Sequence, residues 1–337
     1  MKRVFASLKK FLRNRWAFRA IGLVLFAFIL LRIDLKEALA TLKQVNLWFV
    51  LLSIGIQLVA LVVATTRWQV ILRRLNIHLP FHRSFIHQLI GTSAALLTPG
   101  QLGEFVKIAY HRREGFPAAE SALSVVLDRL CDLFVLLAFG FLALVVLIGI
   151  PPVWVAAILA AFAALAVGVI VFLRKKQNIS HWLASLFVRM SPKSYKEAVR
   201  QNAERLAERV TGFDRQFIAT ILGISLGNYA LLLMRVYAII LAVHIVMPFW
   251  YFTMAVPLLR LVGLLPISVL GIGTRDVTSI YLYGQVGVPA TSALVSSTLG
   301  LVTLQVQTII GLIVSWRYPL QTRTEAPLAP QETPARD

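Results

Sequence analysis

The chain is poor in the residue types that build metal and nucleotide sites. It has one cysteine, Cys131 in an apolar stretch, so a disulfide framework and a cysteine-rich metal site are excluded. Its six histidines are scattered, and none pairs with a glutamate at the spacing of a zinc motif. The segment Gly271-Ile272-Gly273 lacks the strand and the third glycine of a dinucleotide fingerprint. We therefore expect neither a metal nor a cofactor.

Acidic residues are also scarce: 15 Asp and Glu stand against 34 Lys and Arg, which gives a net charge of +19. At the same time 58% of the residues are hydrophobic, whereas soluble domains have roughly 45–50%. Several long windows carry almost no charge, which is the pattern of transmembrane helices. The basic excess then follows from the positive-inside rule, so we expect an all-α polytopic membrane protein with no nucleic-acid partner.

The chain divides into three parts. Residues 1–17 form a basic arm that should lie on the cytoplasmic leaflet, residues 18–316 a transmembrane domain, and residues 317–337 a polar tail that we expect to be disordered. The basic loop 174–214 of the transmembrane domain should also be cytoplasmic, which places both termini inside. Six full spans are predicted, at residues 18–33, 47–66, 118–149, 154–173, 217–244 and 290–316.

Two apolar segments are too short to cross. Residues 85–98 reach only roughly 21 Å as a helix, against a core of ~30 Å, before Pro99-Gly100 breaks them. If they crossed, the basic residues that follow would lie outside, so residues 84–113 are predicted as a re-entrant hairpin. Residues 250–265 are similarly short, and a second Pro/Gly break follows them. Because this second hairpin enters from the opposite side, the pattern resembles an inverted-repeat transporter. The residues that break the helices are Pro99, Gly100, Gly103, Pro266, Gly271 and Gly273.

Few ionisable residues lie within the predicted membrane segments, and each costs about 2.5–3.5 kcal/mol at a helix centre unless it is paired or hydrated. Asp128 and Asp132 share one helix face and therefore need a cation or a proton between them. One interpretation is a set of ion pairs that fixes helix packing. The other is a cavity whose arginines bind an anionic headgroup, since guanidinium forks suit phosphate. The candidate cavity residues are Glu104, Asp128, Arg129, Asp132, Arg235, Arg260, Arg275 and Asp276.

Four motifs in order make the chain similar to a known family. They are Arg67-Trp68, Thr98-Pro99-Gly100-x-x-Gly103-Glu104, Asp128-Arg129-x-x-Asp132, and Leu265-Pro266-Ile267-Ser268 followed by Gly271-Ile272-Gly273-Thr274-Arg275-Asp276. From about Arg19 to Trp316 the chain resembles the lysylphosphatidylglycerol synthase transmembrane-region family, also called flippase-like. It departs from the family pattern at Asp128 and Asp276, where glutamate is usual, and at Leu270, where a further glycine is common.

The resemblance implies a stand-alone lipid translocator of the cell (inner) membrane, without the aminoacyl-transferase domain of the larger family members. Its cargo would be an anionic phospholipid or a polyprenyl-phosphate-linked lipid. Two alternatives stay open. One is a membrane enzyme in which Glu104 and Asp128 act as acid and base on a lipid-linked sugar or phosphate. The other is a non-catalytic partner that recruits a separate lipid-modifying enzyme through residues 174–209. The residues favour a transporter over an enzyme, and they indicate no particular lipid, energy source or oligomeric state.

Overall fold

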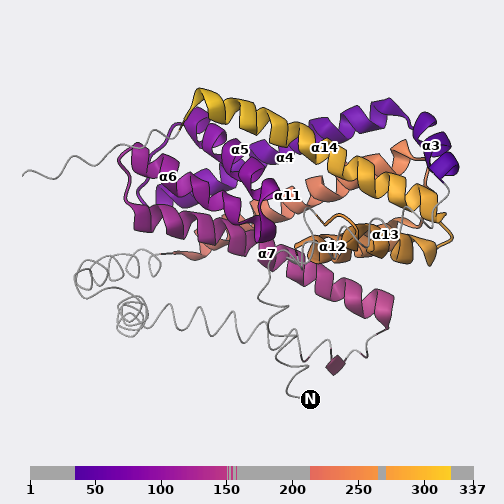
Figure 1. The fold of residues 1–337 in the computed structure, drawn as a ribbon. Coiled ribbons are helices and arrows are strands. Elements are labelled where there is room, and N and C mark those ends of the chain that lie inside the picture. Colours follow the sequence, from indigo (N-terminus) through magenta and orange to yellow (C-terminus); the bar gives the residue numbers. More distant parts are fainter. Residues whose placement is uncertain are drawn as a thin grey trace, which may run out of the picture.

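The computed structural model describes residues 35–149, 151, 153–154, 157, 213–264 and 271–319. All regular elements within these residues are helices, which agrees with the all-α prediction. Figure 1 shows them as one bundle with α6 towards one end and α3 towards the other. In chain order they are α3 (Leu35–Lys43), α4 (Leu47–Arg74), α5 (Phe81–Leu97), the 3-10 helix η1 (Pro99–Phe105), α6 (Val106–Arg113), α7 (Ala118–Ile148), α11 (Arg215–Ala242), α12 (Phe249–Leu264), α13 (Thr274–Gly284) and α14 (Ala290–Arg317).

Four of these helices, α4, α7, α11 and α14, are long and apolar enough to cross a membrane. A helix of 28 residues, the length of α4, extends about 42 Å and exceeds the hydrocarbon core of ~30 Å. Only 17% of the apolar window of α4 is buried inside the protein, so its outer surface suits lipid. The predicted spans at 47–66, 118–149, 217–244 and 290–316 are confirmed, and the protein is a multi-pass membrane protein.

The first short segment folds back on itself as a hairpin. The α-helix stops at Leu97 and Pro99 begins the 3-10 helix, so the chain changes helix type at the predicted break. Arg83 and His87 near the start of α5 lie beside Glu114, which follows α6, with nitrogen–oxygen distances of 3.4 Å for both pairs. The chain therefore returns to the level at which it entered.

The second short segment behaves in the same way. Helix α12 has 16 residues and extends roughly 24 Å, less than the membrane core. The hydroxyl of Tyr251, near its start, donates a 2.6 Å hydrogen bond to the carbonyl of Leu282, near the end of α13. Residues 265–270, which include Pro266, lie outside the described residues, and Gly271 and Gly273 lie just before α13 with positive φ angles of 76° and 83°.

The helix ends gather on two faces of the bundle. On one face, Arg74 at the end of α4 lies 3.7 Å from Asp214, which caps the start of α11. On the same face, the hydroxyl of Tyr110 in α6 donates to the carbonyl of Tyr318, just after α14. We call this the basic face, because the helix ends there carry Arg73, Arg74, Arg83, Arg112, Arg113, Arg215 and Arg317.

On the opposite face, called the far face here, the backbone of Asn46 before α4 donates to Ala242 at the end of α11. Thr291 at the start of α14 contacts Glu37 of α3 there. Helices α4 and α11 therefore run antiparallel. Each begins a half with the same order of elements: a long helix, a short hairpin and a second long helix. The two halves are consequently inverted with respect to each other, as the pattern of breaks predicts.

Several predictions fall on residues that the structure does not describe. These are the basic arm 1–17, the span 18–33, most of the span 154–173 and almost all of the loop 174–214. The predicted tail begins at residue 317, but Arg317 still belongs to α14 and Pro319 accepts a hydrogen bond from Arg113. The description ends at residue 319.

Candidate functional site

The first half contains a buried arginine that holds both aspartates of α7. Arg67 lies in α4, is fully buried, and donates through Nε to Oδ1 of Asp128 at 2.9 Å. Its Nη1 lies 2.5 Å from Oδ1 of Asp132 and also donates to the hydroxyl of Ser225 at 3.1 Å. Because Asp128 and Asp132 are one turn apart on one helix face, a single guanidinium fork reaches both carboxylates.

Two further cations complete this cluster. Lys107 of α6 is fully buried, and its Nζ lies 3.6 Å from carboxylate oxygens of both Glu104 and Asp128. Arg129 brings its Nε within 2.5 Å of Glu104 and its Nη2 within 3.2 Å of Asp132. Three cations thus face three carboxylates, and the group, which we call the paired cluster, is electrically balanced.

The hairpin can reach the cluster because two glycines permit close approach. A side chain at Gly103 would place its Cβ 2.2 Å from the carbonyl oxygen of Ala94, so η1 lies directly against the backbone of α5. At Gly91 an added Cβ would lie 2.6 Å from Cε of Lys107. These contacts give a steric reason for the glycine in the motif Gly103-Glu104, and they fix Glu104 and Lys107 beside α7.

A layer of aromatic rings supports Lys107 from the side of the basic face. Its Nζ lies 4.6 Å from the ring centroid of Trp68, and Trp68 stacks on His111 at 5.0 Å. Burial is the main cause that lowers the pKa of His111 to about 3, with the charge of Lys107 contributing. The ring is therefore neutral near pH 7, and the hydroxyl of Ser121 lies 3.1 Å from its Nδ1.

Within the described helices of the second half, from α11 to α14, the one carboxylate is Asp276, and its partners are local. It is buried, its Oδ2 accepts from the backbone of Gly273 at 2.9 Å, and its Oδ1 accepts from the hydroxyl of Ser297 at 2.5 Å. Arg275 donates to the hydroxyl of Ser297 at 3.1 Å and also to the carbonyl of Ser297. Asp276 therefore caps the start of α13 and joins it to α14.

Two arginines remain without such partners. In the part of the chain that the structure describes, no carboxylate oxygen lies within 4.0 Å of Arg235 or Arg260. Arg235 is only 4% exposed, and its Nε and Nη1 have no hydrogen-bond partner. Arg260 projects into open space between the helices. The described charged side chains of the second half therefore carry an excess of positive charge.

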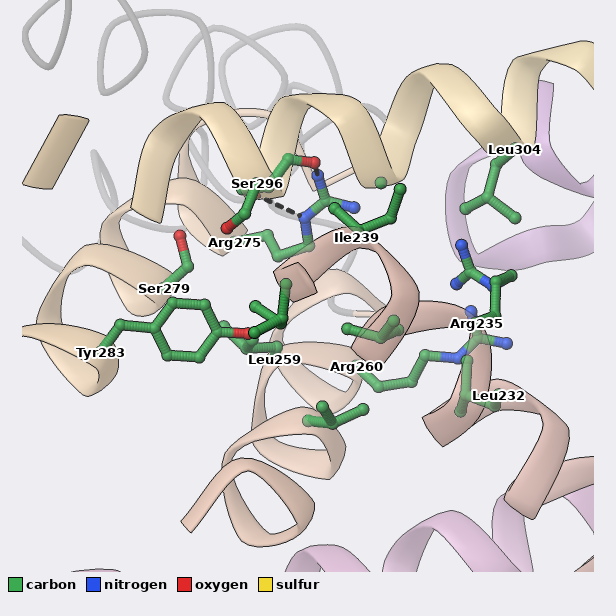
Figure 2. A pocket seen from close by; sticks show the side chains of 15 residues that line it. Leu232, Arg235, Ile239, Leu259, Arg260, Arg275, Ser279, Tyr283, Ser296 and Leu304 are labelled. Atoms are coloured by element: carbon green, nitrogen blue, oxygen red, sulfur yellow. Dashed lines mark hydrogen bonds between the residues drawn. The ribbon is translucent and has the colours of Figure 1, made fainter. Parts of the chain in front are cut away.

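Three connected cavities surround these arginines. The wide chamber, between α7, α11 and α12, has a volume of about 380 Å³ and is bounded by Arg129, Asp132 and Arg260. The polar chamber, about 130 Å³, adds amides from α4 and α14. The arginine chamber, about 90 Å³, is lined by Arg235, Arg260 and Arg275, as Figure 2 shows. Leu232 and Arg260 line all three, so the chambers meet at these side chains.

The amides of the polar chamber form a chain of hydrogen bonds across three helices. Gln57 of α4 donates to Gln307 of α14 at 2.5 Å, and Gln307 donates to the hydroxyl of Thr92 in α5 at 2.8 Å. Asn228 of α11 also lines this chamber. The walls can therefore exchange hydrogen bonds with a hydrated headgroup.

The structure brings most of the predicted site residues together, but in two groups. Glu104, Asp128, Arg129 and Asp132 belong to the paired cluster, whereas the other predicted residues, Arg235, Arg260, Arg275 and Asp276, lie in the second half. The sequence analysis missed Arg67 and Lys107. Arg67 follows the last apolar residues of a predicted span, but no helix breaker separates Thr66 from Arg74, and this was the available signal that the helix continues.

Comparisons with known proteins agree with this architecture. The family model described as "Lysylphosphatidylglycerol synthase TM region" matches residues 17–311, which include all the site residues. The chain is 27% identical over 302 residues to a protein of Methanothermobacter thermautotrophicus called "UPF0104 membrane protein", covering 81% of this chain and 86% of that protein.

It is 24% identical over 319 residues to "UPF0104 membrane protein PH1989" of Pyrococcus horikoshii, covering 87% of this chain and 94% of that protein. No solved structure matches it significantly. Because the family model spans most of the chain and contains both charged groups, the protein belongs to the lysylphosphatidylglycerol synthase TM-region family, whose membrane domain is associated with lipid handling.

Proposed function

We propose that the protein moves an anionic, phosphate-bearing lipid between the two leaflets of the cell membrane. The observation that carries the proposal is the pair Arg235 and Arg260, neither of which has a described carboxylate within 4.0 Å. Arg260 lines all three chambers, and the buried Arg235 lines the arginine chamber and the polar chamber. A buried charge without a partner costs several kcal/mol. Charged groups persist at membrane depth where they serve a path for ions or substrates. A net anion in the chambers would supply the missing charge.

The distribution of cations along the bundle supports a path rather than a single binding point. Arg67 lies two helical turns from the end of α4 at the basic face, and Arg235 lies two turns from the end of α11 at the far face. Two turns correspond to about 10 Å along the helix axis. A headgroup would therefore meet Arg129 first, then Arg260, and Arg235 last, while its acyl chains stay in the bilayer.

The orientation in the membrane follows from the same faces. The helix ends at the basic face carry arginines from five helices, whereas the described lysines of the far face are Lys36 and Lys43 of α3. The positive-inside rule then assigns the basic face to the cytoplasm. The end of α14 lies on that face, so on this proposal the C-terminus is cytoplasmic.

The enzyme alternative receives less support from the geometry. A general acid or base needs an oxygen free to exchange a proton with the substrate. Glu104 is only 1% exposed and pairs with Arg129, while Asp128 is fully buried between Arg67 and Lys107. Asp128 lines none of the three chambers, and Glu104 lines only the polar chamber. The alternative of a recruiting loop at residues 174–209 falls outside the described residues.

The test is translocation of headgroup-labelled lipids in proteoliposomes. We expect the wild-type protein to move phosphatidylglycerol, phosphatidic acid or a polyprenyl phosphate faster than protein-free vesicles. Arg235→Gln and Arg260→Gln should each lower the rate by at least about tenfold. Arg317→Gln, which removes the same charge from the exposed end of α14, should keep the wild-type rate. Well-folded variants at positions 235 and 260 with full activity would contradict the proposal.

A further inference from the structure

The first long helix of each inverted half corresponds to that of the other at a fixed interval in sequence. Arg67 and Arg235 occupy the same position in helices of equal length, 28 residues each. Asn76 and His244 follow these helices and are as far apart in the sequence as Arg67 and Arg235. Both have a positive φ, 60° and 57°. The prolines that precede the short helices, Pro80 and Pro248, keep this interval too. Arg235 is therefore the counterpart of Arg67.

A second interval, slightly longer than the first, relates the long helices that follow the hairpins. It joins Gly115 to Gly287, both with positive φ, and Pro117 to Pro289. The backbone hydrogen bond from Phe116 to His111 is repeated by the bond from Val288 to Tyr283 at the same interval.

Continued along α7 and α14, this interval assigns a counterpart to each aspartate that holds Arg67. Asp128 corresponds to Gly300, and Asp132 corresponds to Leu304. The second half therefore keeps the arginine of the paired cluster and lacks both of its carboxylates.

The space that the missing groups would occupy is the arginine chamber. Gly300 and Leu304 line it together with Arg235. Val236, the counterpart of the fully buried Trp68, lines it as well, so a small side chain replaces a large one. The space beside Arg67 is thus filled by carboxylates that balance its charge, whereas the corresponding space beside Arg235 is a cavity.

The chamber also offers a second cation and enough room for an oxyanion. Arg275 lines the chamber. By the second interval, which relates His111 of the same helix to Tyr283, Lys107 corresponds to Ser279, and this residue lines the chamber as well. The volume of about 90 Å³ is about six times what one water molecule requires. Arg235 meanwhile has two nitrogens without a partner although it is only 4% exposed.

We infer that the arginine chamber binds an oxyanion of the ligand against Arg235 beside Gly300, in the place that the carboxylate of Asp128 takes beside Arg67. The carboxylate of Asp128 then pairs with Arg67 in the first half as the oxyanion of the ligand pairs with Arg235 in the second. That the oxyanion is the phosphate of a lipid rests on the proposed function, whereas the site itself would equally receive free phosphate.

Restoring the missing carboxylate tests this inference directly. A Cβ added at Gly300 meets no atom within 4 Å, so a side chain can begin at this position without displacing a neighbour. Gly300→Asn has the same shape without the charge and is the matched control. The readout is the apparent Kd of purified, delipidated protein in detergent, obtained from thermal stabilisation by short-chain phosphatidic acid. Inorganic phosphate and short-chain phosphatidylcholine are the parallel arms.

We expect Gly300→Asp to weaken phosphatidic acid binding at least about tenfold, because the new carboxylate occupies Arg235. Gly300→Asn should stay within about threefold of the wild type. Stabilisation by phosphatidic acid alone would identify a lipid site, and equal stabilisation by inorganic phosphate would identify a free oxyanion site. Equal weakening by both variants, or undiminished binding to Gly300→Asp, would overturn the inference. If both variants unfold, Leu304→Asp and Leu304→Asn provide the same comparison one turn further along α14.

These outcomes separate the inference from the proposed function. Binding that is lost in Gly300→Asp, without lipid translocation by the wild type, would leave the oxyanion site standing and contradict the transport proposal. Lipid translocation at the wild-type rate by Gly300→Asp would leave the transport proposal standing and contradict the oxyanion site beside Arg235.

Discussion

The two equivalent arginines should respond in opposite directions to the same substitution. Arg67→Met removes the partner of two carboxylates, the buried Asp128 and the half-buried Asp132, and leaves them with only the remaining cations of the paired cluster. Breaking a buried ion pair in this way costs about 3–5 kcal/mol. Arg235→Met removes a buried cation that has no carboxylate partner among the described residues, and each unsatisfied buried donor costs about 1–3 kcal/mol.

The expected result in the absence of anionic lipid is therefore a lower apparent Tm for Arg67→Met, by on the order of 10 °C. For Arg235→Met we expect an unchanged or higher apparent Tm. A matched substitution at the exposed Arg73, on the basic face, should leave the apparent Tm unchanged.

The protein supplies its own probe for this measurement. Cys131 is its one cysteine, is 9% exposed, and lies on α7 between the two aspartates. A thiol-reactive fluorescent dye should label it only when this region opens, so the labelling temperature reports unfolding near the cluster. The reasoning is refuted if both methionine variants lower the labelling temperature by the same amount, because Arg235 would then have a stabilising partner in the ligand-free protein.

Two further predictions concern packing and the path. Gly103→Ala should lower the apparent Tm, since its Cβ would lie 2.2 Å from a backbone oxygen and overpacking costs about 1–3 kcal/mol or more. Gly223→Ala should leave the apparent Tm unchanged, because its Cβ meets nothing within 4 Å. Thermal unfolding of both variants checks this prediction. Leu232→Trp should slow lipid translocation several-fold by narrowing the junction of the three chambers, whereas Leu226→Trp on the half-exposed surface of α11 should keep the wild-type rate. Equal rates for the two tryptophan variants in proteoliposomes would contradict a path through this junction.

Hydropathy and helix breakers were enough to predict the four spans that the structure describes and both short segments. Apolar length decides whether a helix can cross, and a Pro-Gly pair such as Pro99-Gly100 ends an α-helix wherever it occurs. The grouping of Glu104 with Arg129 was also within reach, because charges at membrane depth need partners.

The partners themselves were not predictable from spacing. Which cation holds Asp128 and Asp132 depends on how α4 and α7 are rotated against each other, and a single sequence does not contain that rotation. A hydropathy window also places a span boundary at the first charge, so Arg67 was assigned to a loop although α4 continues to Arg74 and buries it completely. Lys107 was counted with a basic loop for the same reason.

The difference between the halves has a mechanistic consequence. In the first half, ion pairs from Glu104 and Lys107 join the hairpin to α7. In the second half, α13 is joined to α14 through the neutral Ser297. Both kinds of link contain an ionised group and are therefore charge-assisted, but only the first joins two opposite charges, whose attraction adds to the hydrogen bond. The link through Ser297 is therefore the weaker of the two. An oxyanion bridging Arg235 and Arg275 would supply the ionic link that this half lacks. On our proposal the ligand therefore stabilises one position of the second hairpin. Its release frees that hairpin to move against a fixed first half. The ligand then binds one conformation more tightly than the other, which a carrier needs in order to change conformation with its cargo.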